Sequence, residues 1–121
     1  MKKANISIVI IAIILLIIIC SIGYILLSLR LNNVEKRGYI ESCQEYLNSE
    51  TDFLQTYGKI ISFQTNDTYP PTKVELQNGK EYYMDFQCET EKAVFEIRVF
   101  HIFTDEWSYR YDVNKETIIW K

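Results

Sequence analysis

The chain has 121 residues, of which 13 are basic and 16 acidic, giving a formal net charge of −3. All 16 acidic residues and all but two of the basic ones follow residue 29, so the C-terminal part is acidic. Nucleic-acid binding needs a basic stripe, and this composition argues against that class of function. The 90 residues from 32 to 121 are enough for one small domain.

Residues 6–29 form an apolar run without a charged side chain, and eleven of these 24 residues are isoleucine. As a helix at about 1.5 Å per residue, the run covers roughly 36 Å, whereas the hydrocarbon core of a bilayer is about 30 Å thick. A secretory signal has an apolar stretch of only about 7–15 residues, ending at small residues. Leu29 is instead followed by Arg30 and Leu31. We therefore expect an uncleaved anchor that contacts the lipid bilayer through residues 6–29.

This interpretation divides the chain into a tail and transmembrane anchor over residues 1–31 and a soluble domain over residues 32–121. Cys20 leaves a lipoprotein alternative open, although the isoleucines before it are not the small residues that such a cleavage site favours. Basic residues flank both ends of the run almost equally. The short basic tail, with Lys2 and Lys3, favours a single-pass protein of the cell membrane with its domain extracytoplasmic.

The first element after the anchor is predicted to be a helix over residues 32–47 that continues from it. Ile40, Cys43 and Leu47 share one helical face. Gly38 weakens a helix and is the expected place for a bend. A second helical stretch is predicted over residues 50–57, with Ser49 as its N-cap and Gly58 in the left-handed conformation that ends many helices.

From Lys59 onward the apolar residues recur with period two, which indicates β-strands. Asn78-Gly79 predicts a tight hairpin with a type I′ turn. The predicted strands cover residues 60–65, 73–77, 80–90, 93–103 and 107–113, with a last short strand over 117–120 after a turn at Asn114-Lys115. The expected fold is therefore α+β: a transmembrane helix, then a small domain with one or two helices packed on an antiparallel meander sheet of four or five strands.

One face of this sheet is expected to be polar, yet it carries the apolar or aromatic residues Tyr83, Phe100 and Ile102. Arg98 and Arg110 project from neighbouring strands on the same face. The favoured interpretation of the arginines is a cross-strand charge ladder with the nearby acidic residues Asp85, Glu96 and Asp112. Apolar residues on a solvated face also make these five side chains the candidate surface for a protein partner.

Catalytic, cofactor and metal motifs are not found in the sequence, and we expect a non-enzymatic protein without a cofactor. His101, the only histidine, falls on the apolar face of the sheet, where a hydrogen-bonded core residue is the favoured interpretation. Cys43 and Cys88 would permit a disulfide in an extracytoplasmic domain. Two buried thiols are the favoured alternative.

The order of elements, together with Phe53-Leu54-Gln55-Thr56-Tyr57-Gly58-Lys59-Ile60, resembles the cytochrome c oxidase assembly factor one family over roughly residues 41–113. That family shares its domain with a subunit of the mitochondrial inner-membrane translocase and has many small bacterial members. The resemblance implies a membrane-tethered interaction domain, and it supplies no catalytic residues.

The leading hypothesis is a membrane-anchored domain that binds another protein, as an assembly or accessory factor. The second is a membrane-bound immunity protein that neutralises a toxin. The third is a sensor or enzyme that uses His101 and a cysteine. Gene neighbourhood would separate the first two.

Overall fold

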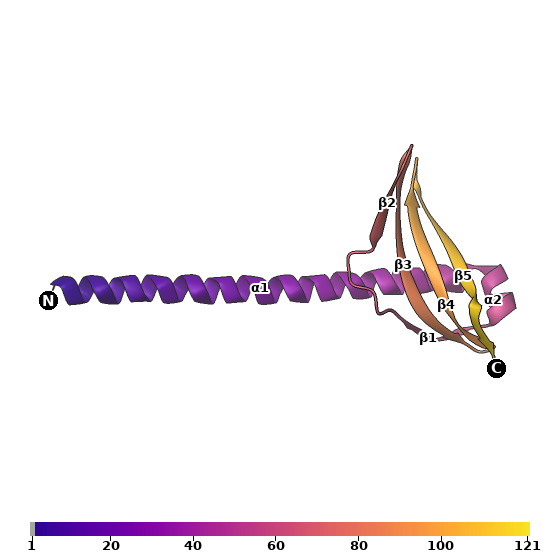
Figure 1. The fold of residues 1–121 in the computed structure, drawn as a ribbon, viewed down its shortest axis with the longest axis horizontal. Helices are drawn as coiled ribbons and strands as arrows, with labels where there is room; N and C mark the ends of the chain where they lie inside the picture. Colours follow the sequence, from indigo (N-terminus) through magenta and orange to yellow (C-terminus); the bar gives the residue numbers. More distant parts are fainter. Residues whose placement is uncertain (1) are drawn as a thin grey trace. The chain divides into compact units, whose positions relative to one another are not determined.

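The computed structural model describes residues 2–121, with side chains from residue 5 onward, and has the predicted α+β fold (Figure 1). Two helices precede a five-stranded sheet in which every strand pair is antiparallel. The elements are α1 (Lys2–Ser49), α2 (Thr51–Tyr57), β1 (Ile60–Gln64), β2 (Thr72–Leu76), β3 (Gly79–Thr90), β4 (Ala93–Phe103) and β5 (Trp107–Trp120). The chain forms two compact units, Met1–Glu35 and Lys36–Lys121.

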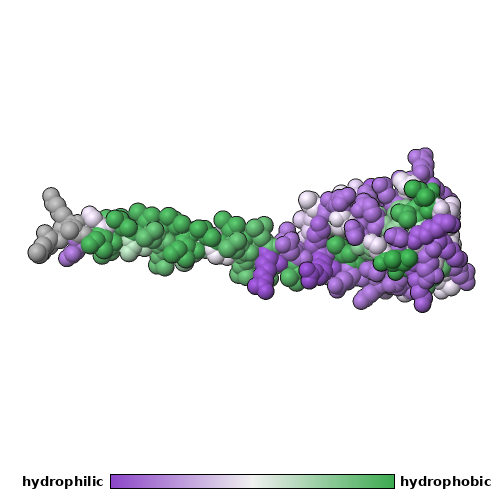
Figure 2. All heavy atoms as spheres, turned by 90° about the horizontal axis from the view of Figure 1, so that it is seen from below, coloured by the Kyte–Doolittle hydropathy of each residue, from purple (hydrophilic) through white to green (hydrophobic). Residues whose placement is uncertain are grey.

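The first unit contains the apolar part of α1. Side chains 5–35 are all exposed, and Figure 2 shows the middle of this stretch as a hydrophobic band with hydrophilic side chains at its two ends. The helix from Asn5 contains an apolar window with a mean hydropathy of 3.3, none of it buried, and it is long enough to cross a membrane. The Ser21 hydroxyl donates to the Ile17 carbonyl at 2.8 Å, so this serine satisfies its polar group within the helix.

The second unit begins within α1, which continues through residue 49 as expected and is not interrupted at Gly38. Cys43 and Leu47 are fully buried. Ser49 was predicted to cap α2, and this prediction is wrong. Ser49 is the last residue of α1, where its hydroxyl donates to the Tyr46 carbonyl at 2.6 Å, and Glu50 occupies the N-cap position without a side-chain bond.

Gly58 ends α2 with a positive φ of 82°, as predicted, and its N–H donates to the Leu54 carbonyl at 2.8 Å. Its ψ of −171° is extended rather than left-handed helical. The chain therefore leaves α2 directly in an extended direction, and β1 begins at Ile60.

The sheet has the order β1-β3-β4-β5, and β2 also pairs with β3. β1 pairs with the C-terminal part of β3 and β2 with its N-terminal part. Where neither β1 nor β2 pairs with β3, side chains of the loop that joins β1 to β2 bond to the β3 backbone instead. The Thr65 hydroxyl donates to the Asp85 carbonyl at 2.6 Å, and the Asp67 carboxylate accepts from the Asp85 N–H at 2.8 Å.

The predicted type I′ turn at Asn78-Gly79 is wrong. Leu76 pairs with Gly79, so the turn residues are Gln77 and Asn78, and Gly58 is the only described residue with a positive φ. Gly79 meets a steric requirement instead. A Cβ at this position would clash with the carbonyl oxygen of Phe103 on the neighbouring strand β4.

The predicted turn at Asn114-Lys115 is an irregularity inside one long strand, not a break between two. Both ends of β5 pair with β4, with a register shift between the Val94–Ile119 and Glu96–Asn114 pairs. The Thr117 hydroxyl fixes this bulge, because it accepts from the Glu96 N–H at 2.9 Å and donates to the Asn114 carbonyl at 2.7 Å.

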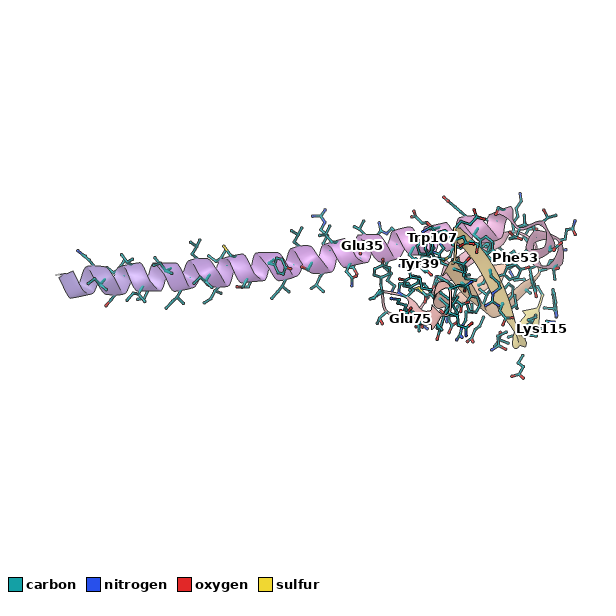
Figure 3. All side chains as sticks on the ribbon, turned by 90° about the horizontal axis from the view of Figure 1, so that it is seen from above. Glu35, Tyr39, Phe53, Glu75, Trp107 and Lys115 are labelled. Carbon is teal, nitrogen blue, oxygen red and sulfur yellow. The ribbon has the colours of Figure 1, made fainter. Side chains whose placement is uncertain are left out.

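The core lies between the helices and the inner face of the sheet. Phe53 contacts three rings, those of Tyr57, Phe95 and Tyr111, at centroid distances of 5.2 to 6.0 Å. In Figure 3, Tyr39 and Phe53 lie among the side chains gathered against the sheet. The buried hydrophobic cluster comprises Cys43, Leu47, Phe53, Tyr57, Met84, Phe86, Cys88, Ala93, Phe95, Ile97 and Val99.

Candidate functional site

The five residues of the predicted partner surface come together on the outer face of the sheet. Strand register places them in three adjacent rows across β3, β4 and β5. The rows are Glu81-Ile102-Ser108, Tyr83-Phe100-Arg110 and Asp85-Arg98-Asp112. These nine residues are called the outer patch below. The helices pack on the opposite face, since the buried cluster uses the alternate residues of the same strands.

Arg110 covers Phe100 in the middle row of the outer patch. Its guanidinium carbon lies 4.0 Å from the centre of the Phe100 ring. Its Nη2 donates to a Glu81 carboxylate oxygen at 3.0 Å. Phe100 is only 9% exposed as a result, although it lies on the solvated side of the sheet. A cation over a ring face is stabilised by the ring quadrupole, so the pair is a cation–π contact as well as a cover.

Arg98 repeats the arrangement on the adjacent row. Its guanidinium carbon lies 4.1 Å from the centre of the Tyr83 ring. It donates through Nε and Nη2 to the two carboxylate oxygens of Asp85, at 2.7 and 3.0 Å. These hydrogen bonds raise the pKa of Arg98, so the side chain stays charged. Such a bidentate pair fixes the plane of the guanidinium.

The predicted charge ladder is therefore present in part. Arg98 pairs with Asp85 as expected, and Arg110 pairs with Glu81, which the sequence analysis did not single out. Among the described residues, Glu96 and Asp112 form no salt bridge. The register could have indicated Glu81, because it lies diagonally across β4 from Arg110.

A shallow hollow of about 530 Å³ adjoins the outer patch beside Arg98. The β5 bulge forms one side of it, through Asn114, Lys115 and Glu116. Acidic side chains outnumber basic ones around it. The charged lining residues are Asp85, Glu96, Asp112 and Glu116 against Arg98 and Lys115.

His101 lies on the inner side of the sheet in an aromatic stack. Its ring centre is 4.4 Å from that of Tyr109, nearly parallel, and 4.3 Å from that of Trp107. Burial lowers its pKa. The predicted hydrogen bond is not found: among the described residues, His101 has ring contacts but no hydrogen bond, and neither buried cysteine bonds to it. This arrangement suits packing rather than acid–base chemistry.

Cys43 and Cys88 are buried free thiols, as the favoured alternative predicted. Burial raises the pKa of each to about 12. The Tyr39 hydroxyl lies beside Cys43 without a hydrogen bond of standard geometry, and burial raises the pKa of this tyrosine too. Neither thiol has the depressed pKa of a nucleophile or metal ligand. Within residues 5–121, no group of three or more His, Cys, Asp or Glu could hold a metal ion.

No protein-family model matches this chain, and neither a curated protein nor a solved structure matches it. The resemblance to the assembly factor family thus stays a prediction from the sequence.

Proposed function

We propose that this chain is a single-pass membrane protein whose C-terminal domain binds another protein through the outer patch. The apolar helix supports the membrane location, because it is long enough to span a bilayer and its side chains are exposed. The domain is proposed to be extracytoplasmic, which fits the basic residues Lys2 and Lys3 before the apolar run. The proposed role is that of an assembly or accessory factor, which needs binding and not catalysis.

The observation that carries the proposal is the pair of arginines held flat over rings on an uncovered sheet face. Arginine and tyrosine are enriched among the residues that dominate protein–protein binding energy. Arg98 and Arg110 are already oriented by Asp85 and Glu81. A partner would therefore order few side chains on binding, which lowers the entropic cost of association.

The charge of the surface indicates the chemistry of the partner. The hollow beside Arg98 has four acidic and two basic lining side chains, and Glu96 and Asp112 are not neutralised by a salt bridge in the described part of the chain. A lysine or arginine of the partner would complement this hollow. The other two rows of the outer patch, which contain Tyr83 and Ile102, would then contact a more apolar area of the partner.

The test is site-specific photo-crosslinking in intact membranes. A photoreactive residue at Ile102 should give one dominant adduct, and the same residue at Glu41, an exposed position on α1, should not. The adduct at Ile102 should weaken about tenfold when Glu96→Lys and Asp112→Lys are combined, because both place a positive charge against a basic partner. No adduct at Ile102, or equal adducts at both positions, would refute binding through the outer patch. An adduct with a secreted toxin would identify the immunity role.

A further inference from the structure

β5 forms one edge of the sheet, because it pairs with β4 on one side and with no strand on the other. Its regular ladder with β4 runs from the Phe103–Trp107 pair to the Glu96–Asn114 pair, where the bulge begins. Apart from that ladder, no described hydrogen bond uses a backbone group of residues 107–113. Within the described part of the chain, the N–H and C=O groups of this stretch that point away from β4 therefore have no hydrogen-bond partner.

Natural proteins block such edges with bulges, prolines or inward-pointing charges. The bulge blocks only the part of β5 beyond Asn114. The inner-face residues before it are Trp107, Tyr109, Tyr111 and Val113, and none of them is charged. The stretch from 107 to 113 thus has no bulge, proline or inward-pointing charge, and its charged residues Arg110 and Asp112 lie on the outer face. Such an edge is suited to the addition of another strand whose charges match.

The outer-face sequence of this edge is self-complementary in charge. Arg110 and Asp112 stand two residues apart on the same face, with Tyr111 between them on the other. When two copies of β5 pair antiparallel about a two-fold axis at Tyr111, Arg110 of each copy lies opposite Asp112 of the other. Ser108 then faces Asn114, and Tyr109 faces Val113. From residue 108 to residue 114, polar residues meet polar ones and apolar residues meet apolar ones.

The neighbouring registers are less favourable. An axis at Arg110 would set the two Arg110 side chains against each other, and an axis at Asp112 would do the same for the two carboxylates. Like charges directly opposite each other destabilise an antiparallel pair. Registers shifted by one residue would place outer-face residues against inner-face ones. The axis at Tyr111 is also close to the middle of the regular 107–114 ladder.

We propose that two copies of this chain associate by pairing their β5 strands antiparallel about Tyr111. Asp112, which has no salt-bridge partner among the described residues, gains one in Arg110 of the second copy. Arg110 has further donors for this pair, because only its Nη2 is used by Glu81 and a guanidinium has five N–H donors. This inference does not depend on the proposed partner binding.

The test uses full-length chains with two different epitope tags, co-expressed in membranes and extracted in mild detergent. Wild-type copies should co-purify. Arg110→Asp in both copies, or Asp112→Arg in both, should reduce recovery about tenfold, since both cross-strand pairs become repulsive. Co-expression of an Arg110→Asp copy with an Asp112→Arg copy should restore recovery, because every 110–112 pair is again of opposite charge. Glu116→Arg, in the bulge outside the ladder, is the matched control and should have no effect.

A disulfide measurement keeps the proposal testable if the charge variants fold poorly. In a Cys20→Ser background, a copy with Arg110→Cys should form a disulfide under mild oxidation with a differently tagged copy with Asp112→Cys. Two copies that both carry Asp112→Cys should cross-link much less, because those positions are diagonal rather than opposite. Wild-type copies that do not co-purify, a mixed pair no better than either single swap, or equal cross-linking in both cysteine combinations would each overturn the proposal.

Discussion

Arg110 lies flat over Phe100, with its guanidinium carbon 4.0 Å from the ring centre, and this contact covers a phenylalanine on the solvated face of the sheet. The same arginine donates to Glu81, so one side chain ties together β3, β4 and β5. The charged side chain of Arg110 thus shields the Phe100 ring from solvent, so this part of the face is not an exposed hydrophobic area.

Replacement of Arg110 by alanine should destabilise the domain modestly and in a way that depends on Phe100. An exposed cation–π contact contributes about 0.5–1 kcal/mol, and the Arg110–Glu81 pair is too exposed to add much. In urea unfolding followed by tryptophan fluorescence, Arg110→Ala should lower the free energy of unfolding by about 1 kcal/mol or less. A double-mutant cycle with Phe100→Leu should show coupling. Strictly additive effects would contradict the cation–π interpretation.

Gly79 and Gly38 should respond in opposite ways to alanine. A Cβ at Gly79 would clash with the Phe103 carbonyl, so Gly79→Ala should lower the free energy of unfolding by about 1–3 kcal/mol. Gly38 has no atom within 4 Å of the place where a Cβ would stand. Gly38→Ala should therefore stabilise α1 by about 1 kcal/mol. Thermal unfolding of the two variants, compared side by side, checks the prediction, and equal effects would refute it.

His101 should make the domain less stable as the pH falls. Its folded-state pKa lies below its ordinary value of 6.5 because of burial. As the pH falls, the unfolded chain takes up this proton first. The stability due to a neutral His101 is thus fully present above about pH 6.5 and is lost as the pH falls from there through the lower folded-state pKa. The fall in melting temperature between about pH 7.5 and 5.5 should be smaller in His101→Phe than in the wild type. An equal fall in both proteins would show that protonation of His101 is not the cause of the pH dependence.

Cys43 and Cys88 should be unreactive in the folded protein. A thiol with a pKa of about 12 has almost no thiolate near neutral pH, and both side chains are buried. Maleimide labelling should therefore reach neither residue until the domain is unfolded. Unfolding without a reductant should then expose both as thiols. Labelling of both only after reduction would show instead that they form a disulfide.

Sequence periodicity was sufficient for the class of fold, since both helices and the long strands follow from apolar spacing. The errors fall where tertiary contacts override local chemistry. Asn78-Gly79 has the composition of a type I′ turn, yet Gly79 is required by the nearby Phe103 backbone. Asn114-Lys115 has the composition of a turn, but Thr117 and Asn114 hold it as a bulge because β4 continues alongside.

The candidate surface was predicted better than its internal pairing. Alternation along β3, β4 and β5 placed Tyr83, Phe100 and Arg110 on one face, and the register then set them in one row. Both arginines contact rings, and Arg110 pairs with Glu81 instead of Asp112. These contacts depend on strand register and side-chain rotamers, which cannot be read from the periodicity of the sequence.

The most direct test of the account is the membrane association and mass of the mature chain. Membranes from cells that express the protein would be washed in alkaline carbonate, and the chain analysed by intact mass and N-terminal sequencing. The account predicts a chain that stays in the washed membranes and still carries residues 6–29. A chain released into the supernatant, or one that begins after Leu29, would show that the apolar helix is a removed signal and would contradict the account.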